Sequence, residues 1–96
     1  MEESDELIPQ KFFVDQNYPN PFNPSTEIRF GLPAESFVTV KIFNALGQEV
    51  STLFEGNLNA GIHNLQFAPS DLSSGIYLYR VQADQLIDIR SMMFVK

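Results

Sequence analysis

The stretch Asn17-Tyr18-Pro19-Asn20-Pro21-Phe22-Asn23-Pro24-Ser25-Thr26 precedes the first strand-like segment of this 96-residue chain. Its three prolines fix their own φ and push each preceding residue into extended geometry, so the stretch cannot be helical. Its three asparagines favour turns, because their side chains hydrogen-bond to nearby backbone. We therefore predict a structural clasp that packs through Tyr18 and Phe22 and shields one edge of a β-sheet domain, in preference to a contact surface or a catalytic loop.

Six segments after this clasp have the sequence pattern of short strands. In residues 27–32, the apolar Ile28, Phe30 and Leu32 alternate with polar or small residues, which is the period of a half-buried strand. Residues 37–44 show the alternation most clearly, because β-branched residues dominate one face. The other segments are 49–55, 62–68, 76–83 and 86–95. Without any helical period longer than one turn, they predict an all-β antiparallel sandwich of six or seven short strands.

Glycines mark the connections between these segments. Gly47, Gly61 and Gly75 are expected to be turn glycines with a purely structural role, and Gly47 supplies the positive φ of a tight hairpin. Residues 56–61 are predicted to form the next connection, and residues 70–74 a single helical turn.

The last two segments have different faces. Residues 76–83 are apolar on both faces at first, which predicts a central strand covered on both sides. In residues 86–95, the charged residues Asp88 and Arg90 indicate that one face is partly exposed to solvent. The other face carries the apolar residues Ile87, Ile89, Met93 and Val95.

Length, composition and charge exclude several classes of protein. The chain is long enough for one small domain, which buries about 60–65% of the surface that its unfolded form exposes. There is no cysteine, so disulfides and thiolate chemistry are excluded. The net charge of −6, with six scattered basic residues, argues against nucleic acid as a partner. No apolar run approaches the roughly 18 residues of a bilayer span, so we predict no membrane insertion.

The N-terminal residues differ in composition from the rest of the chain. Residues 1–11 are predicted to be an acidic linker, or a tail added for expression, ahead of a domain at residues 12–96. A secretory signal begins with positive charge, whereas residues 1–6 are acidic, so any signal of that kind is expected elsewhere.

No catalytic or metal-binding pattern can be assembled from these residues. His63 is the only histidine and lies in strand-like sequence, so a structural role is favoured over that of a base or ligand. Asp84 and Asp88 cannot supply the six to eight oxygens that Ca²⁺ requires. Tyr77 and Tyr79 alternate within the most apolar segment, which favours packing over stacking on a sugar. We therefore expect no catalytic, metal or cofactor site and no enzyme activity.

Several motifs follow one another from the clasp to the last residue. They are residues 13–26 with Phe30-Gly31-Leu32-Pro33, then residues 42–50, Asn59-Ala60-Gly61-Ile62-His63, and residues 72–80. With the ending Met92-Met93-Phe94-Val95-Lys96, they resemble in order and spacing the C-terminal sorting domains, type A, of the type IX (Por) secretion system. The resemblance covers residues 12–96. One departure is residues 68–71, where many relatives carry a tryptophan just before the aspartate.

This resemblance implies an immunoglobulin-like sandwich at the C-terminus of a protein exported by Bacteroidetes. An N-terminally attached cargo would fold in the periplasm and reach the cell surface or the medium through the type IX secretion translocon. A sortase-like cysteine peptidase would then cut the linker, which we expect between Glu6 and Gln16, where an unstructured chain is accessible.

The resemblance also places the sorting signal at the C-terminus, so we expect the last strand to be recognised. A strand at a sheet edge offers unpaired backbone groups that a partner strand can extend. The residues of this recognition segment are Ile89, Arg90, Met92, Met93, Phe94, Val95 and Lys96. Packing of some of them in the core is compatible with this role.

Other functions remain open at this point. The immunoglobulin-like domain of flagellar hook-capping proteins shares the Asn-Pro-Phe-Asn-Pro lead-in and a Ser-Gly-Ile-Tyr type of strand, and would serve in assembly. The end of the chain at Lys96 favours sorting, because the capping domain usually lies within a longer chain. A sugar-binding accessory module would need an exposed planar row of aromatic residues, and an enzyme would need a polar pocket around His63.

Overall fold

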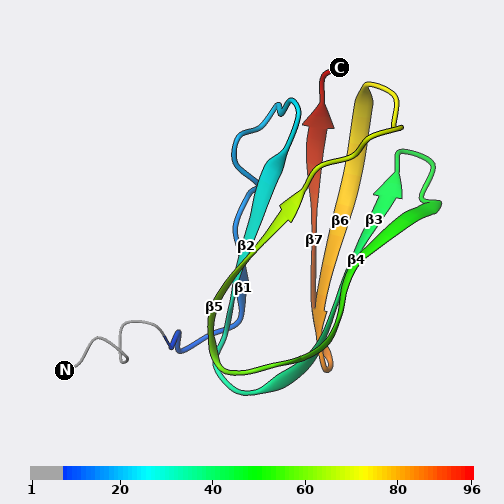
Figure 1. Ribbon diagram of the computed structural model, residues 1–96. Helices are drawn as coiled ribbons and strands as arrows, with labels where there is room; N and C mark the ends of the chain where they lie inside the picture. Colours follow the sequence, from blue (N-terminus) through cyan, green and yellow to red (C-terminus); the bar gives the residue numbers. More distant parts are fainter. Residues whose placement is uncertain (1–7) are drawn as a thin grey trace.

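The computed structural model of the chain describes residues 8–96, which form seven strands and no helix. The strands are β1 (Phe13–Val14), β2 (Thr26–Leu32), β3 (Ser36–Asn44), β4 (Glu49–Leu58), β5 (Gly61–Phe67), β6 (Gly75–Ala83) and β7 (Leu86–Phe94). One antiparallel sheet has the order β1-β2-β5 and the other the order β4-β3-β6-β7 (Figure 1). The predicted all-β sandwich is confirmed. No helix that could cross a membrane is found within the described residues.

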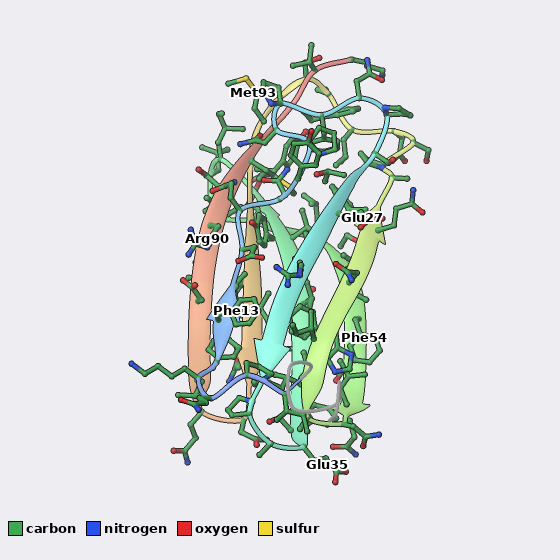
Figure 2. All side chains as sticks on the ribbon, turned by 90° about the vertical axis from the view of Figure 1, so that its left-hand side faces the viewer. Phe13, Glu27, Glu35, Phe54, Arg90 and Met93 are labelled. Carbon is green, nitrogen blue, oxygen red and sulfur yellow. The ribbon has the colours of Figure 1, made fainter. Side chains whose placement is uncertain are left out.

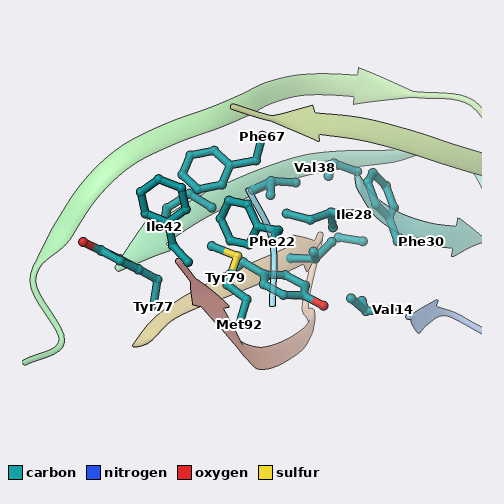
Figure 3. Packing of buried hydrophobic residues seen from close by; sticks show 14 of the residues in the cluster. Val14, Phe22, Ile28, Phe30, Val38, Ile42, Phe67, Tyr77, Tyr79 and Met92 are labelled. Carbon is teal, nitrogen blue, oxygen red and sulfur yellow. The ribbon is translucent and has the colours of Figure 1, made fainter. Parts of the chain in front are cut away.

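The core lies between the two sheets and follows the alternation in the sequence. Ile28, Phe30 and Leu32 of β2 are fully buried, as their spacing predicted. The same holds for the inner row of β3, at residues 38, 40 and 42. Figure 3 shows these side chains meeting residues from the clasp, β6 and β7. Each large side chain buried in this way contributes about 1.5–3 kcal/mol relative to exposure, so this apolar cluster is the main source of stability.

The connection predicted at residues 56–61 is wrong, because β4 continues further than its sequence indicated. Gly56 pairs with Val38, and the ladder runs on until Leu58 pairs with Ser36. Only Asn59 and Ala60 then carry the chain from the four-stranded sheet to the three-stranded sheet (Figure 1). The partner strand β3 overrides the low strand propensity of glycine and asparagine.

The other connections agree only in part with the sequence. Gly47 has a φ of 84° in the β3–β4 hairpin, as predicted. Gly61 and Gly75 are the first residues of β5 and β6, where the chain leaves a connection with φ values of 137° and 154°. The predicted helical turn at residues 70–74 is also wrong, because this segment has only bends. The Tyr77 hydroxyl donates to the Ser73 carbonyl at 2.7 Å and so ties this loop to β6, a tertiary contact that prevails over local helix formation.

The strand β6 is central in its sheet but covered on one face only, contrary to the prediction. Tyr77 and Tyr79 point into the core, whereas Ile76 on the outer face remains 42% exposed. The second sheet packs on the inner face of the four-stranded sheet, and no layer of the described residues covers the outer face (Figure 1).

The strand β1 was not predicted, because its two residues are too few to show the alternation of apolar and polar side chains. It pairs with β2 so that the Phe13 ring covers Gly31. A Cβ atom at position 31 would overlap the carbons of that ring, so glycine allows the close approach. The Arg29 guanidinium lies 5.6 Å from the centroid of the same ring.

Candidate functional site

The strand β7 forms one end of the four-stranded sheet and pairs with β6 alone among the described strands. The apolar face predicted for this strand is exposed. Ile87 is 52% exposed and Met93 41% exposed. The side chains of β7 that enter the core are instead those of Met92 and Phe94, which lie on the same face as Asp88 and Arg90.

Half of the outer edge of β7 is covered by the clasp, residues 17–26, and by Gln16 just before it. The Phe22 N–H donates to the Met93 carbonyl at 2.9 Å, and the Phe22 carbonyl accepts from the Val95 N–H at 3.1 Å. The Gln16 Nε2 atom donates to the Ser91 carbonyl at 2.7 Å. In the same way Asn20 Oδ1 accepts from the Met93 N–H at 2.9 Å. Met93 and Val95 are therefore closed to another strand. Ser91 is engaged only through its carbonyl, by the Gln16 side chain, and among the described residues nothing covers the edge at residues 86–90.

Phe22 is the apolar anchor of the clasp. It is 1% exposed, and its ring centroid lies 5.0 Å from that of Phe94 and 6.0 Å from that of Phe67. The clasp thus joins both sheets. The expectation that Tyr18 packs alongside is wrong, because its side chain is 81% exposed. Only its backbone is engaged, in two hydrogen bonds with Glu27.

A buried tyrosine hydroxyl holds the start of the clasp. Tyr79 Oη donates to the Asp15 carbonyl at 2.7 Å and accepts from the Asn17 N–H at 2.8 Å. The Asn17 side chain is also buried, and its Nδ2 donates to Thr26 Oγ1 at 3.0 Å. Thr26 Oγ1 in turn donates to the Pro19 carbonyl at 2.8 Å, which closes the loop upon itself. Sequence reasoning missed this network, for which the only signal was that a buried tyrosine hydroxyl needs a partner.

Burial raises the pKa of Tyr79 from 10.0 to about 12, and the hydrogen bond from the Asn17 backbone partly offsets this increase. We expect the free energy of unfolding to fall as pH rises from about 10 to about 12. The folded state holds this proton more tightly than the unfolded state, so the contribution is complete below pH 10 and lost above pH 12. Urea unfolding across this range measures the effect, and a Tyr79→Phe variant with the same pH slope would contradict it.

Within residues 8–96, the other candidate residues form no reactive constellation. The His63 ring stacks on Phe30 at 5.6 Å between centroids, and its Nε2 atom lies 2.8 Å from the Asn59 carbonyl oxygen. Tyr77 and Tyr79 are buried, so they cannot form an exposed platform for a sugar. A hollow of about 450 Å³ opens beside residues 68–72, where the sequence departs from the motif, and Asp71 is the only ionisable residue among those that line it.

The structure divides the predicted recognition segment into a buried part and an exposed part. Met92 and Phe94 are 1% and 5% exposed and belong to the core. Arg90 is half-buried, and its guanidinium lies 3.6 Å from the Asp88 carboxylate. Side chains available to a partner are those of Ile89, Met93, Val95 and Lys96.

Comparison with known proteins agrees with the resemblance seen in the sequence. Residues 16–96, most of the chain, match the family described as "Secretion system C-terminal sorting domain". Curated proteins give no significant match to this chain. The chain belongs to this family of C-terminal sorting domains, which direct an attached cargo to the cell surface or the medium by type IX secretion.

Proposed function

We propose that the type IX machinery recognises this sorting domain by the exposed side chains at the C-terminal end of β7. The observation that carries this proposal is that Ile89, Met93 and Val95 are 54%, 41% and 45% exposed at the end of the chain. Large apolar side chains that gather on a surface are typical of interaction sites. Lys96, also exposed, adds a positive charge beside them.

The mode of recognition follows from the clasp. Its hydrogen bonds to Met93 and Val95 occupy the edge of β7 at this end, so strand addition is blocked at residues 93–95. We therefore assign recognition at these positions to side chains on the outer face. Met92 and Phe94 act indirectly, because their packing in the core holds the strand in place.

The domain acts in this proposal as a non-catalytic address that passes through the periplasm with its cargo. A sortase-like cysteine peptidase of the secretion system removes it by cutting the linker. From Asp15 onward the chain is tied down, because the Asp15 N–H donates to the Arg29 carbonyl and the Asp15 carboxylate pairs with the Arg29 guanidinium at 2.6 Å. Gln10 and Lys11 are exposed, which favours a cut before Phe13. Residues 1–7 of the predicted linker lie outside the described residues.

The test of recognition is a double variant, Met93→Asn with Val95→Asn, fused behind an exported fluorescent reporter in a type IX-competent bacterium. We expect the secreted reporter to fall about tenfold or more, because a tenfold loss of affinity requires only about 1.4 kcal/mol, which two residues at the centre of a binding site can supply together. The melting temperature should stay close to that of the wild type, because both side chains are exposed.

The matched control is Phe37→Asn, which removes a 45% exposed apolar side chain from β3, a strand not adjacent to β7. It should leave export unchanged. Undiminished export of the folded double variant would refute the proposal. Deletion of residues 92–96 is a weaker test, because it removes the buried Met92 and Phe94 and so unfolds the domain.

A further inference from the structure

We propose that the free half of the β7 edge, residues 87–91, pairs with the same segment of a second copy of this chain to form a symmetric dimer. This inference rests on the fold and uses the edge of the strand. It shares Ile89 with the proposed recognition surface but does not involve Met93 or Val95.

The backbone of this half-edge is free to pair. The N–H and C=O groups of residues 91, 93 and 95 that contact Gln16 and the clasp point away from β6. Because β7 keeps an unbroken register with β6, the groups of Ile87 and Ile89 point the same way. Among the described residues no other strand or turn bonds to them. Figure 2 shows β7 at the margin of the molecule, with β1 set further inside.

The charges along this half-edge are complementary to themselves. In an antiparallel pair centred on Ile89, Asp88 of each copy lies opposite Arg90 of the other copy. Within one copy the same two side chains approach only to 3.6 Å, and the buried Arg90 Nε has no hydrogen-bond partner among the described residues. Opposite charges across a strand pair stabilise it, and like charges destabilise it. A register centred on Asp88 would place the two carboxylates opposite each other, so the charges select the register centred on Ile89.

The apolar side chains and the clasp agree with this register. It places Ile89 of one copy beside Ile89 of the other, on the outer face where each is 54% exposed. Ile87 then faces Ser91, whose carbonyl can accept from an incoming N–H as well as from Gln16. The clasp of one copy lies opposite the Asp84-Gln85 turn of the other, so it limits the new ladder to residues 87–91. This short contact predicts a weak dimer, with a dissociation constant on the order of 0.1–1 mM.

Charge reversal tests both the dimer and its register. In Asp88→Arg and in Arg90→Asp, each homodimer would place like charges opposite each other at two positions. We expect each variant to dimerise about tenfold more weakly than the wild type in sedimentation equilibrium. An equimolar mixture of the two variants should dimerise at least as well as the wild type, because every opposed pair in the heterodimer is of opposite charge. The double variant, with both reversals in one chain, should recover the homodimer.

Two further measurements keep the test independent of folding. Ile89→Lys replaces an exposed side chain and sets two ammonium groups against each other, so it should also weaken the dimer. In the wild type, the amide resonances of Ile87 and Ile89 should shift with concentration. A wild type that stays monomeric to about 2 mM, above the dissociation constant expected for so small a contact, would overturn the proposal. A mixture that associates no better than its components would overturn it as well. Loss of export in the Met93/Val95 variant with the dimer intact would show that the two surfaces act separately.

Discussion

Phe22→Ala is expected to lower the free energy of unfolding by about 3–5 kcal/mol. The ring is 1% exposed and lies between Phe67 of one sheet and Phe94 of the other, so its removal leaves a void where the sheets meet. A domain of this length has a total stability of about 5–14 kcal/mol, so the variant would be close to unfolding at 37 °C. Urea titration followed by circular dichroism measures the loss.

The matched control for this variant lies in the same clasp. Tyr18→Ala removes an aromatic side chain that is 81% exposed, so we expect a change within about 0.5 kcal/mol. Equal losses in the two variants would mean that the clasp is stabilised by its backbone alone. The buried ring of Phe22 would then contribute no more to the free energy of unfolding than the exposed ring of Tyr18.

Tyr79→Phe is expected to lower the free energy of unfolding by about 2–4 kcal/mol, although it removes a single oxygen atom. Without the hydroxyl, the Asn17 N–H loses its acceptor and the Asp15 carbonyl loses its donor. Asn17 is 2% exposed, so water cannot readily replace the lost partner. Urea unfolding measures the stability, and hydrogen exchange should show faster exchange of the Asn17 amide.

A second tyrosine provides the comparison for this substitution. The Tyr77 hydroxyl makes one hydrogen bond, to the carbonyl of the exposed Ser73, which water can reach after Tyr77→Phe. We expect a loss of about 0.5–1.5 kcal/mol there. Should Tyr79→Phe cost no more than Tyr77→Phe, the hydroxyl of Tyr79 would not be what anchors the clasp.

The sequence correctly predicted those strands in which the alternation of neighbouring residues shows which face is buried. In β2 and β3, one row of residues is clearly more apolar than the other, so alternation identifies both the strand and its buried face. In β7 both rows contain large apolar residues. The local pattern therefore does not show which row faces the core. The register with β6 determines this, because it places Met92 beside the buried Tyr77.

The candidate site was less accessible to sequence reasoning, because it is built from distant residues. The C-terminal strand was identified by resemblance, but nothing local showed that the clasp covers half of its edge. The contact between Asn17 and Tyr79 spans 62 residues, and neither residue type reveals the other. The choice of Phe22 over Tyr18 as the anchor likewise depends on where the clasp crosses the gap between the sheets.

The hydrogen bond between Asn20 and Met93 joins residues that are 73 positions apart. During synthesis, the proline-rich segment emerges long before the strand that it must meet. A polypeptide that stops short of this strand leaves Phe22 without Phe94 and leaves the Asn20 side chain without its donor. The clasp can therefore close only once β7 is in place, so a chain interrupted before this strand is expected to stay open to proteolysis.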